Sequence, residues 1–74
     1  MKEFKDYEGV VCKDRAELLF LAKKAKEKGY NITTKIISRP RYNHLIFYKG
    51  YFCDASKWAI QFKILREEFL ERVG

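Results

Sequence analysis

Residues 42–53 read YNHLIFYKGYFC, and the rest of the predicted fold can be built outward from this stretch. Apolar and aromatic residues fill two short runs, 42–48 and 51–53, on either side of Lys49-Gly50. A glycine in a two-residue gap between such runs is typical of a β-hairpin, because glycine readily adopts the positive φ that the turn requires. The stretch therefore predicts two antiparallel strands.

Two further segments upstream have the character of strands. Residues 30–38 are rich in Ile and Thr and alternate along the chain, and residues 7–12 end in an apolar run. Arg39-Pro40-Arg41 separates 30–38 from the hairpin, since proline cannot donate to a strand ladder. We therefore expect residues 30–38 and the hairpin to form an antiparallel meander, with residues 7–12 as an additional strand.

The first helix is predicted over residues 14–28. Asp14 and Glu17 have the spacing of a capping box, and Gly29 stands where a left-handed residue ends a helix. Apolar residues recur at helical spacing between these two signals. The stripe that they form, and that we expect to face the core, consists of Leu18, Leu21, Ala22 and Ala25.

A second helix is predicted to end the chain, from Asp54 or Ser56 to Arg72 or Val73. Large apolar residues recur in this segment at spacings of four, three, four and four, which would place them on one helical face. These residues are Trp58, Phe62, Leu65, Phe69 and Val73. The predicted order is therefore β-α-β-β-β-α. It describes an α+β fold in which both helices pack on one face of an antiparallel sheet.

Length and composition agree with one small domain over residues 1–74. The chain is 47% hydrophobic and 16% aromatic, which is too apolar for intrinsic disorder. Its longest uninterrupted apolar run, residues 18–22, is far too short to span a membrane, and no apolar stretch follows the charged start. We therefore expect a cytoplasmic protein that has no membrane partner.

Catalysis, metals and cofactors are not expected. Cys12 and Cys53 lie forty residues apart without a CxxC motif, and His44 is the single histidine. This pattern favours buried free thiols over a zinc site or a disulfide framework. The sequence contains no glycine-rich phosphate loop and no nucleophile motif, so it predicts a non-enzymatic protein.

The charge distribution indicates where this protein would bind a partner. The net charge is +6, and residues 28–53 contain no acidic side chain. Aromatic rings interleave with basic residues in this window, as on the sheet surfaces that stack bases and contact phosphates. The candidate binding residues are Lys35, Arg39, Arg41, Tyr42, His44, Tyr48, Lys49 and Tyr51.

Nucleic acid is the first partner that these residues predict. An alternative is an adaptor or inhibitor that docks on an acidic protein surface, as small regulators of phages and other mobile elements do. Arg39 and Arg41 would then engage carboxylates, and the tyrosines would anchor the contact. A third interpretation is that the aromatic rings only stabilise the sheet through cross-strand pairs.

Three apolar residues do not fit the predicted core. Ile60 and Ile64 fall opposite the apolar face of the terminal helix, and Phe20 falls on the back of the first helix. These residues predict a homodimer interface, because an exposed apolar patch favours self-association. The alternative is that other parts of the same chain cover them, with the segment around Phe4 and Tyr7 covering Phe20.

Overall fold

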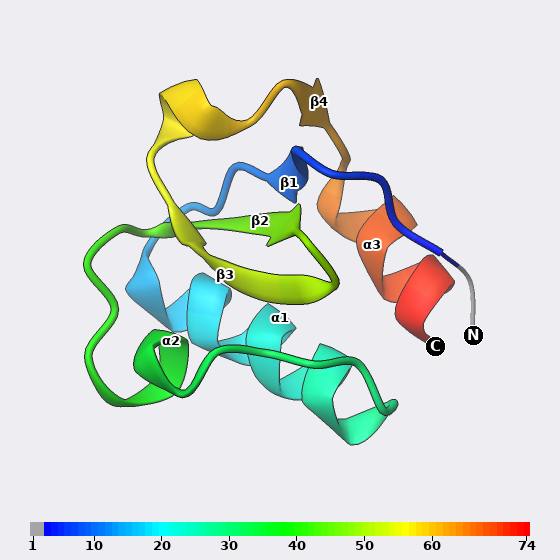
Figure 1. Cartoon of the computed structure of the whole chain (residues 1–74), viewed down its shortest axis with the longest axis horizontal. Coiled ribbons are helices and arrows are strands. Elements are labelled where there is room, and N and C mark those ends of the chain that lie inside the picture. Colours follow the sequence, from blue (N-terminus) through cyan, green and yellow to red (C-terminus); the bar gives the residue numbers. More distant parts are fainter. Residues whose placement is uncertain (1–2) are drawn as a thin grey trace.

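The computed structural model describes residues 3–74, in which a four-stranded sheet and three α-helices enclose one core (Figure 1). Along the chain the elements are β1 (Glu8–Val10), α1 (Arg15–Glu27), α2 (Thr34–Ser38), β2 (His44–Tyr48), β3 (Tyr51–Ala55), the 3-10 helix η1 (Lys57–Ala59), β4 (Phe62–Lys63) and α3 (Arg66–Val73). The strand order is β3-β2-β1-β4. The predicted α+β class is therefore confirmed.

The hairpin forms where the sequence predicts it. Strands β2 and β3 pair antiparallel, with Tyr48 opposite Tyr51 across the turn. Lys49 and Gly50 both have positive φ, 50° and 86°, as the two-residue turn requires. On the other side of β2, strand β1 also pairs antiparallel.

Helix α1 also has its predicted bounds and caps. The Asp14 carboxylate accepts a hydrogen bond of 2.9 Å from the Glu17 N–H. The Glu17 carboxylate in turn accepts one of 3.0 Å from the Lys13 N–H, which completes the capping interaction. Gly29 follows the helix with φ at 94°, and this left-handed residue ends it. All four stripe residues are fully buried.

The predicted strand over residues 30–38 is wrong. Only Asn31 to Thr33 run along the sheet, where the Asn31 carbonyl accepts from the Phe52 N–H and the Thr33 N–H donates to the Phe52 carbonyl. Residues 34–38 turn into α2 instead, and Ile36 is completely buried in the core. The Ile and Thr content favoured a strand, but the packing of Ile36 against the core outweighs this local preference.

The predicted terminal helix is also wrong over most of its length. Its first part forms the end of β3, η1 and β4, and only the last eight residues form α3. β4 pairs parallel with β1, so the sheet is mixed and not antiparallel throughout. The Tyr7 carbonyl accepts from the N–H groups of Gln61 and Phe62, and the Gly9 carbonyl accepts from the Ile64 N–H. These bonds fill the free edge of β1 and hold the segment extended.

The isoleucines proposed for a dimer interface belong to the interior. Ile64 is 4% exposed and lies in the core, while Ile60 is half-buried over Gly9. The basis for that interface is therefore wrong for both residues, because the segment is extended and not helical. Phe20 is exposed, as a partner-binding residue would be, and neither Phe4 nor Tyr7 covers it. The cations of Lys24 and Arg66 lie over its ring.

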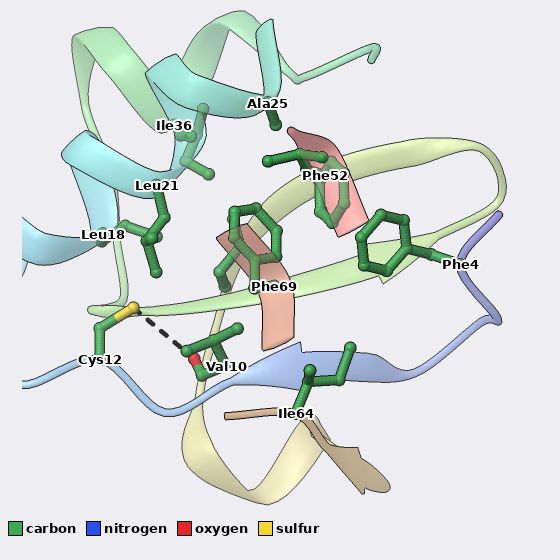
Figure 2. Packing of buried hydrophobic residues seen from close by; sticks show 13 residues of the cluster. Phe4, Val10, Cys12, Leu18, Leu21, Ala25, Ile36, Phe52, Ile64 and Phe69 are labelled. Carbon is green, nitrogen blue, oxygen red and sulfur yellow. Dashed lines mark hydrogen bonds between the residues drawn. The ribbon is translucent and has the colours of Figure 1, made fainter. Parts of the chain in front are cut away.

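The core is built around aromatic rings that come from distant parts of the chain (Figure 2). The Phe52 ring lies 5.0 Å from that of Phe4 and 5.5 Å from that of Phe69, both edge to face. Edge-to-face contacts stabilise a core beyond the area that they bury. The N-terminal segment and α3 are thus attached to the hairpin through Phe52.

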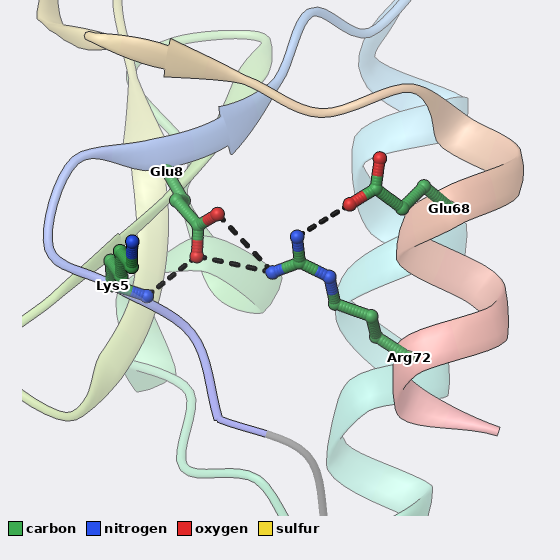
Figure 3. Close-up of polar contacts among 4 residues, drawn as sticks. All are labelled: Lys5, Glu8, Glu68 and Arg72. Carbon is green, nitrogen blue, oxygen red and sulfur yellow. Dashed lines mark hydrogen bonds and ion pairs between the residues drawn. The ribbon is translucent and has the colours of Figure 1, made fainter.

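A partly buried ion pair joins β1 to α3, between the buried Glu8 and the half-buried Arg72 (Figure 3). The Glu8 carboxylate accepts a 2.6 Å hydrogen bond from the Lys5 N–H and two of 3.2 Å from Arg72. Arg72 also donates to Glu68 on the same helix. Burial by itself would lower the pKa of Arg72, but the hydrogen bonds to Glu68 and Glu8 raise it overall. The guanidinium therefore stays charged opposite Glu8.

Candidate nucleic-acid interface

The outer face of the sheet is the one that α1 and α2 do not cover. Leu45 and Phe47 point from β2 into the core, whereas His44, Ile46 and Tyr48 alternate with them. Figure 1 shows the segment from β3 through η1 to β4 crossing this side of the sheet, away from α1 and α2. The crossing covers only part of the face, and two open pockets remain beside it.

A short loop before β2 is held in place by side chains. The Asp54 carboxylate accepts hydrogen bonds from the N–H groups of Arg41 and Tyr42, at 2.7 and 2.8 Å. The Arg15 guanidinium donates to the Asn43 side-chain oxygen at 3.3 Å. Asp54 thus uses one carboxylate oxygen to position the backbone of two candidate binding residues, while their side chains stay exposed.

The first pocket, which we call the basic pocket, has a volume of about 330 Å³. Its lining combines three cations with two aromatic rings and includes no carboxylate. The lining residues are Arg15, Arg41, Tyr42, Asn43, His44, Ser56, Lys57 and Trp58. Trp58 is 90% exposed, so its ring is not part of the core that the sequence predicted for it. Phe62 and Leu65, also predicted to face the core, are exposed as well.

His44 has a defined donor and acceptor in this pocket. Its Nδ1 accepts a 3.0 Å hydrogen bond from the Cys12 N–H. A ring nitrogen that accepts a hydrogen bond carries no proton, so the proton of the neutral imidazole is on Nε2. Nε2 is therefore the atom through which His44 would donate to a ligand.

The second pocket, which we call the tyrosine pocket, has a volume of about 340 Å³. Three tyrosines line it together with small and apolar residues and one acid, Asp54, from the hairpin strands and the segment through η1. The complete lining is Tyr7, Tyr42, Ile46, Tyr48, Cys53, Asp54, Ala55, Ser56 and Ala59. Tyr42 and Ser56 line both pockets, so the two are adjacent.

Tyr7 has an unusual backbone conformation at the rim of the tyrosine pocket. Its φ is 71°, in the left-handed region that costs a non-glycine residue about 1–2 kcal/mol. The ring centroids of Tyr7 and Tyr48 lie 5.1 Å apart, and a hydrogen bond with Tyr48 raises the pKa of Tyr7. The cross-sheet bonds of Tyr7 hold this conformation, since its N–H donates to the Phe47 carbonyl.

The structure divides the sequence-predicted binding residues into separate groups. Arg41, Tyr42 and His44 meet in the basic pocket, and Tyr48 lies in the tyrosine pocket. His44 and Tyr48 are four positions apart along β2, a distance of about 14 Å. Lys49 and Tyr51 lie at the hairpin tip, while Lys35 and Arg39 lie on α2 and at its end; all four line neither pocket.

Three charged or aromatic residues of the basic pocket are not among those that the sequence predicts: Arg15, Lys57 and Trp58. Arg15 and Lys57 fall within the predicted helices and outside the acid-free window of residues 28–53, and Trp58 is predicted to face the core. All three come to the pocket because α1 begins beside the loop at Asn43 and because η1 replaces a helical turn. Arg15 lies on α1, whereas Lys57 and Trp58 lie on η1, so no local pattern joins the three.

Both thiols are shifted toward the protonated form, and the potential metal ligands of the described residues do not form a cluster. Burial raises the pKa of Cys12 to about 11, and it also raises that of Cys53. Nearby carboxylates act in the same direction, Glu17 on Cys12 and Asp54 on Cys53. Within residues 3–74, no three His, Cys, Asp or Glu side chains are grouped to hold a metal ion.

The same range holds no helix with the length and apolar character needed to cross a membrane. Comparisons of this chain with models of protein families, with curated proteins and with solved structures found no match.

Proposed function

We propose that this protein binds nucleic acid non-covalently through the basic pocket. The observation that carries the proposal is Trp58, whose large apolar ring is 90% exposed beside three cations. The fold gains little from such a ring, but a base that stacks on it gains about 1–3 kcal/mol. Tyr42 adds a second ring to the same pocket.

The charges around the pocket support a phosphate ligand. Arg15, Arg41 and Lys57 line the pocket without an acidic partner in the lining, and the whole chain carries +6. Cations in this arrangement neutralise phosphates and release the counterions that screen them. Contacts of this kind need no catalytic group, so the proposed function is binding and not catalysis.

The test is fluorescence anisotropy of a labelled single-stranded dodecamer at two salt concentrations. Contacts to about three phosphates predict a slope of log affinity against log salt near −2. Trp58 is the only tryptophan, so a base stacked on it should also quench the intrinsic fluorescence. We expect Trp58→Ala to weaken binding by about tenfold or more.

A matched pair of double variants locates the site. Arg41→Ala with Lys57→Ala removes two cations from the pocket and should flatten the salt slope by about 1.4. Lys35→Ala with Arg39→Ala removes the same charge outside both pockets and should change the slope much less. If the two double variants change the salt slope equally, or if the wild type does not bind at low salt, the basic pocket is not the nucleic-acid site. A partner that survives nuclease treatment in a pulldown would favour an acidic protein instead.

A further inference from the structure

We infer that the tyrosine pocket holds one unpaired base, so that the ligand is single-stranded nucleic acid. The inference rests on the proposed function, since the basic pocket would supply the phosphate contacts. It concerns a different set of side chains, however, and therefore has a test of its own.

The pocket has the volume and the aromatic lining that a planar ring requires. Its floor comes from the cross-strand neighbours Ile46 and Cys53, whose side chains share the outer face. Tyr7 and Tyr48 form a paired aromatic wall on one side, and Tyr42 stands toward the basic pocket. A volume of about 340 Å³ lies within the range of small-molecule sites.

Continuity with the basic pocket points to a base as the occupant. Tyr42 and Ser56 line both pockets, so a strand whose base stacks on Trp58 continues directly toward Tyr48. The path follows β2, where His44 and Tyr48 lie about 14 Å apart. Successive aromatic rings beside a basic groove are the usual arrangement for binding single strands.

A paired base would not fit this arrangement. In a duplex the faces of each base are covered by its neighbours, and only the edges are accessible in the grooves. The rings of the pocket can stack only on a face, so the base must lie outside a helix. The pocket therefore selects single strands over duplexes.

A cation would be the other ligand for a group of three tyrosines, because quaternary ammonium groups bind in aromatic cages. The charges here oppose it. Asp54 is the one acid of the lining, and its Oδ2 already accepts hydrogen bonds from the Arg41 and Tyr42 N–H groups. The Lys49 ammonium lies 5.3 Å from the Tyr48 ring centroid, and the chain carries +6. A neutral base attached to a phosphate chain is favoured by the same charges.

Cys53 provides a direct reporter for the pocket. Its thiol lies in the floor and is half-buried, whereas Cys12 is buried elsewhere in the core. The experiment measures alkylation of Cys53 by N-ethylmaleimide at pH 8.5, by peptide mass spectrometry on the full chain. The ligands are an adenine octamer, the same octamer annealed to its complement, and an abasic octamer that retains only the sugar and phosphate groups.

We expect the saturating adenine octamer to slow the alkylation of Cys53 at least fivefold, while the duplex and the abasic octamer have little effect. Quenching of Trp58 without protection of Cys53 would overturn the inference and leave the proposed function intact. Equal protection by the duplex, or protection by tetramethylammonium, would also overturn it. If neither Trp58 nor Cys53 responds, both proposals fail.

A variant that fills the pocket gives a second measurement. Cys53→Phe places a ring in the floor and should reduce the preference for the single strand over the duplex at least fivefold. Tyr51→Ala is the matched control, since Tyr51 lies on the same strand and outside both pockets. An unchanged preference in a folded Cys53→Phe protein would contradict the inference. Should this variant not fold, the alkylation experiment on the wild-type chain decides.

Discussion

Gly9 has no side chain, and this allows Ile60 to pack directly over β1 on the outer face of the sheet. A Cβ at this position would lie 2.3 Å from the Leu45 carbonyl oxygen and 2.9 Å from the Ile60 Cγ1. The first contact is with backbone that cannot move without breaking the β1–β2 pairing. Gly9 thus permits the close approach of both neighbours.

We expect Gly9→Ala to lower the free energy of unfolding by about 3 kcal/mol, the upper range for overpacking. Urea denaturation followed by circular dichroism measures this. The control is Gly50→Ala, which has a positive φ but nothing within 4 Å of the added Cβ. It should lower the free energy by only about 1 kcal/mol. A Gly9→Ala loss no larger than that of the control would refute the steric argument.

Cys12 makes stability depend on pH in the alkaline range. Its thiol is 4% exposed, and its pKa is about 11 compared with 9.0 for an unburied thiol. The folded protein therefore keeps the proton of this thiol up to a higher pH than the unfolded chain does. The stabilisation is therefore complete below pH 9 and is lost as the pH rises toward 11, with a total change of about 2–3 kcal/mol.

The measurement is the free energy of unfolding at pH 8, 9, 10 and 11 for the wild type and Cys12→Ala. We expect the difference between the two proteins to shrink steadily above pH 9, because the variant lacks the titrating thiol. Other alkaline groups, including Cys53 and the tyrosines, titrate in both proteins and cancel in the difference. A difference that stays constant from pH 8 to pH 11 would show that the Cys12 thiol is not shifted.

At the scale of elements, α3 depends on the ion pair of Arg72 with Glu8. Arg72→Met would leave the Glu8 carboxylate buried without its cation, which typically costs 3–5 kcal/mol. We expect thermal denaturation to show a loss of this size. The double variant Glu8→Gln with Arg72→Met should recover much of it, because the buried charge is gone. Glu68→Gln, which removes the exposed acid of the same cluster, should cost less than 1 kcal/mol.

The segment before α3 shows what a spacing argument can miss. Trp58, Phe62, Leu65 and Phe69 recur at helical intervals, yet residues 60–64 read Ile-Gln-Phe-Lys-Ile and alternate as a strand does. The same residues therefore fit both a helical spacing and a strand alternation. The free edge of β1 selects the extended form, and a local pattern contains no information about that distant edge.

A substitution at Ile64 distinguishes the two patterns. In the structure Ile64 is 4% exposed in the core, so Ile64→Glu buries a charge and should abolish cooperative unfolding. In a helix with Ile64 facing solvent, the same change would leave a folded protein. Phe62→Glu is the control, because Phe62 is 55% exposed and should tolerate the charge. Near-ultraviolet circular dichroism reports which variant keeps its packed core.

At the scale of the whole molecule, the parts predicted correctly are those governed by neighbours in sequence. The hairpin with its Lys49-Gly50 turn and α1 with its Asp14 cap are both local. The parts predicted wrongly, residues 30–38 and 54–65, adopt their conformations through contacts with distant strands.

The candidate site follows the same rule. Arg41, Tyr42 and His44 are close in sequence and line one pocket. Arg15 and Trp58 also line that pocket, but they are far apart in the sequence, and only the tertiary fold brings them together. The strained backbone of Tyr7 has no signature in the sequence either, since tyrosine rarely adopts positive φ.

The parallel pairing of β4 with β1 also has a consequence for the order of folding. β1 lies near the N-terminus, yet its second neighbour in the sheet is more than fifty residues away. Closing so long a loop is slow compared with forming a hairpin or a helix. We therefore expect the crossing over the outer face to be completed last. During refolding the Ile64 N–H, which donates to the Gly9 carbonyl, should become protected from hydrogen exchange after the N–H groups of α1. A newly made chain would then complete the surface that carries both pockets only in the final step, after β4 has been synthesised.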